Sequence, residues 1–564
     1  MRPRDSPATR SPQMNQGTNL RTRTDVLLLA ALCGFLFFYG LGSFGLVGAD
    51  EPRYAQVSRE MLERSDWVTP TLMGKPWLEK PVLYYWQAMV AFRVAGMTDK
   101  AARLPAALDA ALLVAAIYFF LRRFRPGSEL DGALITASCV GVIGFAHAAA
   151  TDMPLAACFS IALLAWYAWY ESERRIYLAA FYVFVALGTL AKGPVAPALA
   201  AVIIVLFLAI KRDWGGIWGT LWVPGIVLYL AVALPWYAAV QLRNPEFFRV
   251  FILEHNLARF SQDVYHHRQP FWFYVPVFLL AMMPWTLVLI LAVAERVRVI
   301  WAEGKKSFSR SEDSYSEKAF SENSWALFLL IWMVVPVLFF SASQSKLPGY
   351  ILPAVPAGAL LVAEYLGARR RAARKLSLGF VAGHAMLCGV LIFAAVSATS
   401  ISAASISANH RLVWGQGMWV AAAIAGVLAL GIGAALLSAG GLRLLSRVTL
   451  FAVVVSVAAV VRFAAPVIDD TRSARPIAES IEAFSHEPVP VAVYRLKRGQ
   501  EYGLEFYLNR PAEKYEDGNI PAAEHVLVAA QGSQSQVAQL VAGRRVSYLT
   551  SIPEQKLELY WVGK

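Results

Sequence analysis

Charged residues are scarce in this sequence. They occupy 16% of its 564 positions, whereas hydrophobic residues occupy 57%. An ordinary soluble domain carries about 25% charged residues, so the scarcity excludes a protein solvated mainly by water. Apolar runs recur at 26–47, 104–121, 217–240 and 448–463, and each is long enough to cross the hydrocarbon core of a bilayer. The sequence therefore predicts a polytopic α-helical membrane protein with about 13 transmembrane helices.

Cysteine is also rare. The four cysteines, Cys33, Cys139, Cys158 and Cys388, all fall inside apolar runs and show no C-x-x-C spacing. This excludes a disulfide framework and a cysteine metal site, and it indicates that these side chains act as small hydrophobic residues.

The formal net charge is +13, but the basic residues form short clusters between apolar runs. That pattern argues against nucleic-acid binding. The clusters fall on one side of the predicted spans, which the positive-inside rule assigns to the cytoplasm. We therefore expect a cytoplasmic tail at 1–25, a transmembrane domain at 26–465 with a first periplasmic loop at 49–103, and a periplasmic domain at 466–564. The first apolar run is too long for a usual signal peptide and predicts an uncleaved anchor.

Three segments outside the predicted spans differ in character. Residues 49–103 are too polar to cross a membrane and rich in Trp and Tyr, which predicts amphipathic helices at the interface that roof a cavity. Residues 303–324 predict a mobile cytoplasmic loop. Beyond residue 466, a small C-terminal α/β domain is predicted from short β-prone runs at 489–494, 505–508, 525–529 and 557–562.

The first periplasmic loop opens with two carboxylates and a guanidinium in Asp50-Glu51-Pro52-Arg53-Tyr54. Pro52 can start a helix, so we expect Asp50 at the helix entrance, where its carboxylate is held at a fixed height. The alternative is a set of solvated charges at a membrane boundary.

Farther along this loop, Glu79 and Lys80 lie between two prolines and precede Tyr84-Tyr85-Trp86. The prolines make the segment rigid, so Lys80 can offer a cation to a phosphate and Glu79 an acid to a hydroxyl, an amine or a metal. An aromatic belt with a snorkelling lysine is the alternative.

Further polar groups are predicted on the same side. Asp152 and Lys192 occupy two short turns, where a helix N-cap and a snorkelling lysine are the alternatives. The loop at 254–270 contains His255, His266, His267 and Arg268, and Lys346 and Tyr350 follow in a later turn. The histidines match no standard zinc spacing, and solvated loop histidines are the alternative. A divalent-metal site with Glu79, His266 and His267 as candidate ligands stays open.

Together these motifs resemble the bacterial aminoarabinose transferases, a branch of the GT-C glycosyltransferases related to the protein O-mannosyltransferases. The residues that carry the resemblance are Asp50 to Tyr54, Leu78 to Pro81 with Tyr84 to Trp86, Ala191 to Pro194, Glu254-His255 with Arg259-Phe260, His267 to Pro270, and Ser345 to Pro353. The resemblance extends from about residue 26 to the C-terminus and implies a GT-C fold.

The resemblance also implies an inner-membrane enzyme that moves 4-amino-4-deoxy-L-arabinose from undecaprenyl phosphate to lipid A at the periplasmic face, with inversion and no required cofactor. Asp50 is then the catalytic carboxylate. Lys80, Arg268 and Arg53 are implied to hold the carrier phosphate. The implied substrate pocket consists of Glu51, Tyr54, Glu79, Tyr84, Asp152, Lys192, His255, His267, Lys346 and Tyr350.

Three alternatives accompany this interpretation. Relatives that transfer galacturonic acid or a hexose to lipopolysaccharide or protein share the framework, and no residue discriminates the sugar. A transporter of a lipid-linked substrate would place its charges near mid-span, whereas here they fall at the external ends of the spans. A non-catalytic assembly factor would use the same cavity only to bind.

Overall fold

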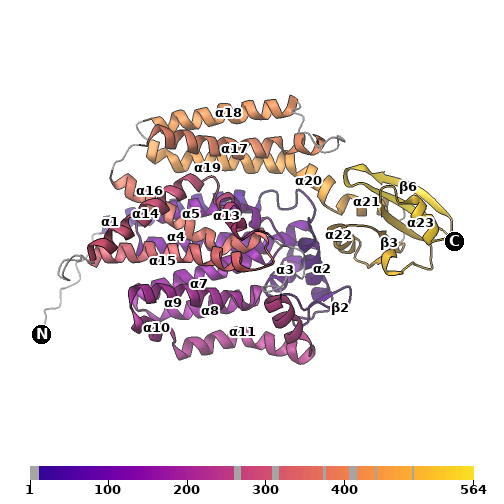
Figure 1. Ribbon diagram of the computed structural model, residues 1–564, viewed down its shortest axis with the longest axis horizontal. Coiled ribbons are helices and arrows are strands. Elements are labelled where there is room, and N and C mark those ends of the chain that lie inside the picture. Colours follow the sequence, from indigo (N-terminus) through magenta and orange to yellow (C-terminus); the bar gives the residue numbers. More distant parts are fainter. Residues whose placement is uncertain are drawn as a thin grey trace.

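The computed structural model describes residues 12–258, 269–307, 317–372, 376–404, 416–438, 441–484 and 488–563. A helical bundle is followed by a small C-terminal domain (Figure 1). The helices of the bundle are α1 (Pro12–Cys33), η1 (Gly34–Phe38), α2 (Asp50–Glu63), α3 (Leu83–Ala95), α4 (Asp99–Phe124), α5 (Glu129–Ala137), α6 (Val140–Ala146), α7 (Asp152–Ser172), α8 (Arg175–Lys192), α9 (Val195–Lys211), α10 (Trp214–Thr220), α11 (Val223–Arg243), η2 (Arg249–Ala258), η3 (Phe271–Phe273), α13 (Tyr274–Ala281), α14 (Thr286–Ser307), α15 (Glu317–Ala342), η4 (Pro348–Ala354), α16 (Val355–Arg371), α17 (Leu378–Ala404), α18 (Gln416–Leu437), α19 (Gly441–Ala459) and η5 (Val460–Ala464).

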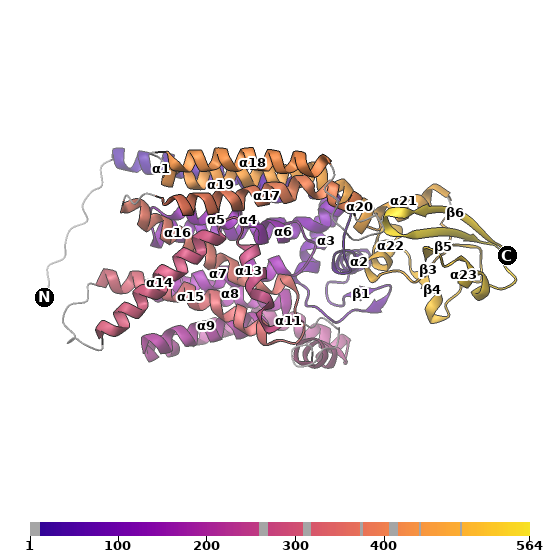
Figure 2. The same cartoon turned by 45° about the horizontal axis from the view of Figure 1, so that its top comes forward.

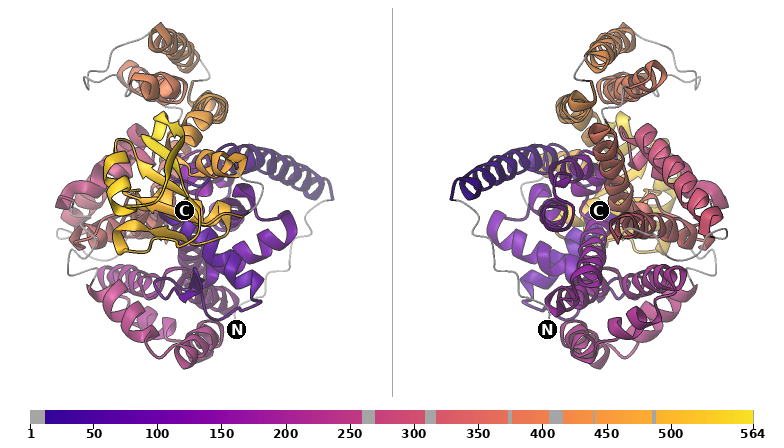
Figure 3. Two further views of the ribbon diagram at one scale, coloured as in Figure 1. Left: turned by 90° about the vertical axis from the view of Figure 1, so that its right-hand side faces the viewer. Right: turned by 90° about the vertical axis from the view of Figure 1, so that its left-hand side faces the viewer.

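The bundle belongs to a multi-pass membrane protein. Within the described residues, nine helices are long and apolar enough to cross a bilayer, and two bent helix pairs raise the number to as many as 11. The figure of 13 spans stays a prediction. Helices α17, α18 and α19 lie along one side of the bundle, and α8 to α11 lie along the opposite side (Figures 1 and 3).

Helix α7 is the most enclosed of these spans, with 89% of its apolar window buried. Its aromatic residues pack against neighbouring helices: Trp166 edge to face against Phe207 of α9 at 5.9 Å, and Tyr167 tilted against Phe328 of α15 at 4.8 Å. This packing fixes the position of α7 along the bundle axis, and with it the position of Asp152 at the start of the helix.

The described parts of the predicted loop at 303–324 are helical. Helix α14 continues to Ser307 and α15 begins at Glu317, so the prediction is wrong for those parts of the segment. Extending an existing helix adds one hydrogen bond for each residue fixed, and polar residues such as Lys and Glu accept helical conformation readily. Residues 308–316 lie outside the described residues.

The first loop forms the helices predicted for it and also a hairpin. Helices α2 and α3 lie at the end of the bundle that faces the C-terminal domain, here called the site end (Figure 2). Between them, β1 (Thr71–Leu72) pairs antiparallel with β2 (Lys75–Pro76). Met73 and Gly74 have φ of 49° and 75°, the left-handed pair that a tight two-residue hairpin requires.

The C-terminal domain is a small α/β layer structure. Its elements are α20 (Ala465–Arg472), α21 (Arg475–Phe484), β3 (Val491–Tyr494), α22 (Arg498–Leu508), β4 (Ala512–Lys514), η6 (Tyr515–Asp517), β5 (His525–Ala530), α23 (Gln534–Leu540), β6 (Val546–Ile552), η7 (Pro553–Gln555) and β7 (Leu557–Val562). The strand order is β4-β3-β5-β7-β6; β3 is parallel to β4 and β5, and β7 is antiparallel to β5 and β6.

The two faces of this sheet form separate cores. Val491 and Val493 pack with Ile477 of α21 and Leu504 of α22, whereas Ala492 and Tyr494 of the same strand pack on the opposite face with α23. This alternation is the period of two expected for a strand covered on both faces.

One of the four runs predicted as strands is wrong. Residues 505–508 form the last turn of α22, while the other three runs correspond to β3, β5 and β7. The run Glu505-Phe506-Tyr507-Leu508 is too short to separate helix from strand, and packing of Leu504 and Phe506 against neighbouring elements decides the outcome. Strands β4 and β6 were missed.

Helix α22 carries a buried carboxylate whose protonation is linked to stability. Burial raises the pKa of Glu505 from its ordinary 4.5 to about 7, and the Lys514 ammonium offsets only part of this shift. One of its oxygens, Oε2, has no hydrogen-bond partner. Between pH 4.5 and 7 the folded chain therefore holds a proton that the unfolded chain releases.

We accordingly expect the stability of the protein to fall as pH rises through this interval, by at most about 3 kcal/mol from this group. Thermal midpoints of the full chain in detergent at pH 5 and pH 8 measure the effect. The Glu505→Gln variant is expected to lose this part of the pH dependence. An identical pH dependence in both proteins would contradict the assignment.

Candidate active site

Two cavities open at the site end. The first, here called the cation cavity, has a volume of about 340 Å³. Its wall contains Glu79, Lys80, Lys192, Phe251, His255, Phe339, Phe340, Ser343, Ser345 and Tyr350. Five residues of the predicted site therefore share one cavity, although they come from four segments of the chain.

The second, here called the carboxylate cavity, is larger, at about 710 Å³. Asp50, Glu51 and Asp152 contribute its acidic groups, and His147 lies among them. The rest of its wall is largely apolar and comes from α6, α17, α19 and η5, including Ile143, Leu391, Ala394, Val453, Val457 and Val461.

The two cavities meet at one ion pair. Nζ of Lys192 lies 2.6 Å from Oδ1 of Asp152, and Asp152 faces the carboxylate cavity while Lys192 faces the cation cavity. Asp152 begins α7 and Lys192 ends α8, so each charge suits the dipole of its own helix. The Lys192 ammonium also lies 4.6 Å from the ring centroid of Tyr350.

The turn after Lys192 allows Phe251, from the opposite wall of the cation cavity, to pack against the backbone at Gly193. Gly193 has φ of 82°, and a Cβ at this position would lie 2.6 Å from Cζ of Phe251. Only glycine adopts this conformation and leaves room for the ring. The turn therefore ends α8 at the lysine and seats Phe251 in the wall of the cation cavity.

Glu79 and Lys80 are positioned by the hairpin before them. The Glu60 carboxylate of α2 accepts hydrogen bonds from the Thr71 hydroxyl at 2.6 Å and from the Met73 amide at 2.7 Å, which ties the hairpin to α2. Oε1 of Glu79 then lies 3.8 Å from Nε2 of His255 across the cation cavity. An acid and an imidazole thus face each other beside the Lys80 and Lys192 cations.

Asp50 lies at the start of α2, as the Pro52 argument predicts. It pairs with Arg53 one turn later at 2.5 Å. Arg53 also lies over three aromatic rings, those of Tyr54, Trp77 and Tyr502, at 5.1, 5.1 and 5.6 Å from their centroids. The Asp50 side chain keeps 49% of its exposure and Arg53 only 13%, so the carboxylate is the accessible member of the pair.

Four other predicted pocket residues are held in packing or backbone contacts. Tyr84 is fully buried and donates to the Ala102 carbonyl at 2.8 Å, and Tyr54 packs against it in the same aromatic cluster. Nζ of Lys346 donates to the Ser343 carbonyl at 2.5 Å. The Glu51 carboxylate is buried and ion-paired with Arg103 at 2.8 Å. These contacts support the walls of the site.

Three predicted residues, His266, His267 and Arg268, lie outside the described residues. Of the candidate metal ligands, only Glu79 is described, and it faces His255. In the part of the chain that the structure describes, no group of three or more ligating side chains gathers into a metal site.

Sequence reasoning missed two parts of the site wall. His147 follows an apolar run without any motif, and the structure places it in the carboxylate cavity with its ring nitrogens near the carbonyls of Ile143 at 3.0 Å and Tyr39 at 3.2 Å. A polar side chain at the end of an apolar run was the signal for His147, whereas Phe251 gave none.

Known proteins with similar sequences share this framework. Residues 79–238 match the sequence profile of the dolichyl-phosphate-mannose-protein mannosyltransferase family. The undecaprenyl phosphate-alpha-4-amino-4-deoxy-L-arabinose arabinosyl transferase of Pseudomonas aeruginosa strain UCBPP-PA14 is 31% identical over 64% of this chain. The enzyme of that name from Pseudomonas savastanoi is 34% identical over 61% of this chain. The matched region spans 62% of the length of each of these two relatives.

Solved structures extend the likeness over nearly the whole chain. The crystal structure of ArnT from Cupriavidus metallidurans bound to undecaprenyl phosphate superposes with a TM-score of 0.73 at 21% identity, covering 95% of this chain and 97% of that one. The apo crystal structure of that protein gives a TM-score of 0.72 at 22% identity. The chain has the ArnT fold. The resemblance to aminoarabinose transferases predicted from the motifs is therefore confirmed, and the C-terminal domain is included in the match.

Proposed function

We propose that this ArnT-like chain transfers 4-amino-4-deoxy-L-arabinose from undecaprenyl phosphate to lipid A, at the periplasmic face of a bacterial inner membrane. The observation that carries the proposal is the meeting of a cation cavity and a carboxylate cavity at the Asp152–Lys192 pair. The name shared by the Pseudomonas relatives and the undecaprenyl phosphate bound to the Cupriavidus protein support the choice of sugar and carrier.

The cation cavity suits the donor. Lys80 and Lys192 face the same space, and two fixed cations stabilise the negative charge that develops on a departing phosphate. Glu79 lies in the same wall and can pair with the ammonium of the amino sugar. Arg268 remains a predicted third phosphate ligand.

The carboxylate cavity suits a lipid acceptor. Its polar corner holds Asp50 and Asp152, and its long apolar wall, with Leu391 and Val453, can accommodate acyl chains without exposing them to water. A lipid-linked acceptor therefore fits this cavity better than a soluble sugar or a peptide.

The reaction is a single displacement with inversion. The bond between the anomeric carbon and the carrier phosphate breaks as a bond to the acceptor oxygen forms on the opposite face, and undecaprenyl phosphate leaves. A phosphate acceptor is already anionic, so Asp50 then orients it or binds the sugar's ammonium. A hydroxyl acceptor gives its proton to Asp50.

The orientation follows from charge. Helix α4 begins at the site end, and its last turn carries Arg122 and Arg123, so those cations lie at the opposite end of the bundle. The last turn of α16 carries Arg369, Arg370 and Arg371. The positive-inside rule assigns such clusters to the cytoplasm, which leaves the site end periplasmic.

Mass spectrometry of lipid A from cells with and without the full-length chain tests the proposal. We expect a mass increment of one pentosamine on lipid A only when the chain is present. An increment of one hexuronate would replace the proposed sugar with galacturonic acid, and unchanged lipid A would overturn the proposed acceptor.

Loss of the shared cation is expected to weaken donor use. Lys192→Met removes a phosphate ligand and leaves Asp152 unpaired, so we expect the KM for the donor to rise about 10- to 100-fold, the usual value of a hydrogen bond to a charged group. Initial rates at varied donor concentration measure it. The control is Lys75→Met, because Lys75 is an exposed lysine in the β1–β2 hairpin and does not line the cation cavity. An unchanged KM in Lys192→Met would remove Lys192 from the donor site.

A further inference from the structure

The C-terminal domain closes on the backbone that leads into the Asp50 helix. Residues 39–49 connect η1 to α2, and within them Val47 forms an isolated antiparallel bridge with Ser473 of the C-terminal domain. The contact is tight, since a Cβ on Gly45 would lie 2.1 Å from Oγ of Ser473, and one on Gly499 would lie 2.9 Å from the Gly48 carbonyl oxygen.

Amides of this connection are held by two side chains from the C-terminal domain. Asp469 of α20 accepts from the Gly45 amide at 2.8 Å, and the Tyr507 hydroxyl of α22 accepts from the Leu46 amide at 2.7 Å. These partners are separated by 424 and 461 positions along the chain. The connection between η1 and α2 is therefore hydrogen-bonded to the far end of the sequence.

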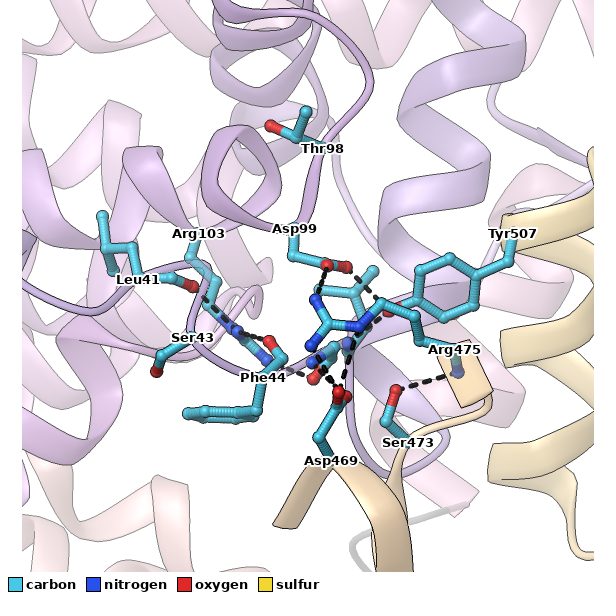
Figure 4. Close-up of polar contacts among 12 residues, drawn as sticks. Leu41, Ser43, Phe44, Thr98, Asp99, Arg103, Asp469, Ser473, Arg475 and Tyr507 are labelled. Atoms are coloured by element: carbon cyan, nitrogen blue, oxygen red, sulfur yellow. Dashed lines mark hydrogen bonds and ion pairs between the residues drawn. The ribbon is translucent and has the colours of Figure 1, made fainter. Parts of the chain in front are cut away.

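Arg475 and Asp99 complete a closed network with these two residues (Figure 4). The Arg475 guanidinium pairs with Asp469 and, at 3.0 Å, with Asp99 at the start of α4. The Tyr507 hydroxyl donates to the other oxygen of Asp99 at 2.7 Å. These four residues, Asp99, Asp469, Arg475 and Tyr507, are called the clamp below.

The carbonyls of the same connection are held from the opposite side by Arg103. Its guanidinium donates to the carbonyls of Leu41, Phe44 and Gly45 at 2.7 to 2.9 Å. The same guanidinium pairs with Glu51, which also accepts from the amides of Val47 and Ala149 at 2.8 Å. The clamp and Arg103 therefore fix both faces of the chain immediately before Asp50.

Helix α22 also contacts α2 along its length. Tyr502 supplies one of the rings around Arg53, and Arg59 donates to the Phe506 carbonyl at 2.6 Å while lying 4.4 Å from the Phe506 ring centroid. The domain thus touches the partner of Asp50 as well as the backbone that precedes it.

We infer that the C-terminal domain is a positioning element for catalysis, and that the clamp fixes the entrance of α2 so that Asp50 is held at its working position in the carboxylate cavity. This inference rests on the proposed function. Asp99, Asp469, Arg475 and Tyr507 are positioning residues, because they act on Asp50 through the backbone at 41–47 and through α2. The donor cation Lys192 lies at the end of α8, apart from α2 and the clamp, so loosening the clamp should impair turnover more than donor binding.

Steady-state transfer by the full-length protein in proteoliposomes tests whether kcat changes more than the KM for the donor. The donor is undecaprenyl-phosphate aminoarabinose and the acceptor is lipid A. Tyr507→Phe removes only the hydroxyl that joins Leu46 to Asp99. We expect kcat to fall about tenfold, while the KM for the donor stays within about twofold, because small displacements of a catalytic group cost up to about 100-fold in rate. Arg475→Met is expected to lower kcat more, and Arg475→Lys to recover part of the loss. The matched control is Tyr548→Phe, since Tyr548 is exposed on the same domain.

Hydrogen exchange of the same proteins gives a readout that does not depend on transfer. Amides at 41–63 are expected to exchange faster in Tyr507→Phe than in the unmodified chain, and those of α7 to exchange at the same rate. If the unmodified chain transfers no sugar to lipid A, the proposed function fails, while faster exchange still supports the clamp. Unchanged kcat together with unchanged exchange in Tyr507→Phe would overturn the inference, and this conservative variant keeps the test valid if Arg475→Met does not fold.

Discussion

Replacing Asp50 with asparagine is expected to lower kcat for sugar transfer about a thousandfold while leaving a folded protein in the membrane. The substitution keeps the size of the side chain but removes the charge that pairs with Arg53 and faces the carboxylate cavity. Both assigned roles require that charge. In one, Asp50 is the base for a hydroxyl acceptor; in the other, it orients an anionic acceptor or the sugar's ammonium. Single-turnover transfer in proteoliposomes measures the loss.

The control for this variant is Asp517→Asn, which removes an exposed carboxylate from the C-terminal domain. Elution from a sizing column and the thermal midpoint establish that both variants fold. Transfer by Asp50→Asn at the rate of the control would exclude Asp50 from the catalytic machinery. It would also leave Asp152 as the remaining carboxylate at the junction of the two cavities.

The largest effect on stability is expected from Arg103→Met. Arg103 is fully buried and is bound by Glu51 and by three backbone carbonyls. Removing it leaves a buried carboxylate without its counter-ion, and breaking such a pair costs about 3–5 kcal/mol. We therefore expect a marked drop in the thermal midpoint of the full chain in detergent.

A double variant separates the charge from the packing. Glu51→Gln combined with Arg103→Met removes both charges at once, so it is expected to be more stable than Arg103→Met alone. Strictly additive losses in the two single variants and the double variant would show that the pair does not stabilise the entrance of α2. The Glu51→Gln single variant completes this double-mutant cycle.

These experiments distinguish two kinds of carboxylate that stand side by side. Asp50 keeps about half of its exposure, whereas Glu51 is buried among Arg103 and two amides. The helix turns by about 100° between them, so the Asp50 carboxylate stays accessible while the Glu51 carboxylate points to Arg103 and the two amides. Neighbouring residues with the same chemistry thus have different effects: activity for Asp50 and stability for Glu51.

The sequence by itself determined that this protein resides mainly in a lipid bilayer, and it determined much of the local structure. Hydropathy over about 20 residues decides whether a helix crosses the bilayer, and that property depends on the segment alone. Pro52 likewise located the start of α2 at Asp50, because a proline acts on the backbone next to it. The motifs also identified Lys80, Asp152, Lys192 and Tyr350 as residues of one region, and the structure brings them to the walls of two adjoining cavities.

Only the tertiary structure decided which of these groups touch. Asp152 and Lys192 are 40 positions apart and Arg103 and Glu51 are 52 apart, and no local pattern distinguishes a paired charge from a solvated one. The strand predicted at 505–508 is part of a helix for the same reason, since packing outweighs the β-propensity of a short run. The clamp is the extreme case. Its contacts with the Gly45 and Leu46 amides join residues 424 and 461 positions apart, so they exist only once the C-terminal domain has docked on the entrance of α2.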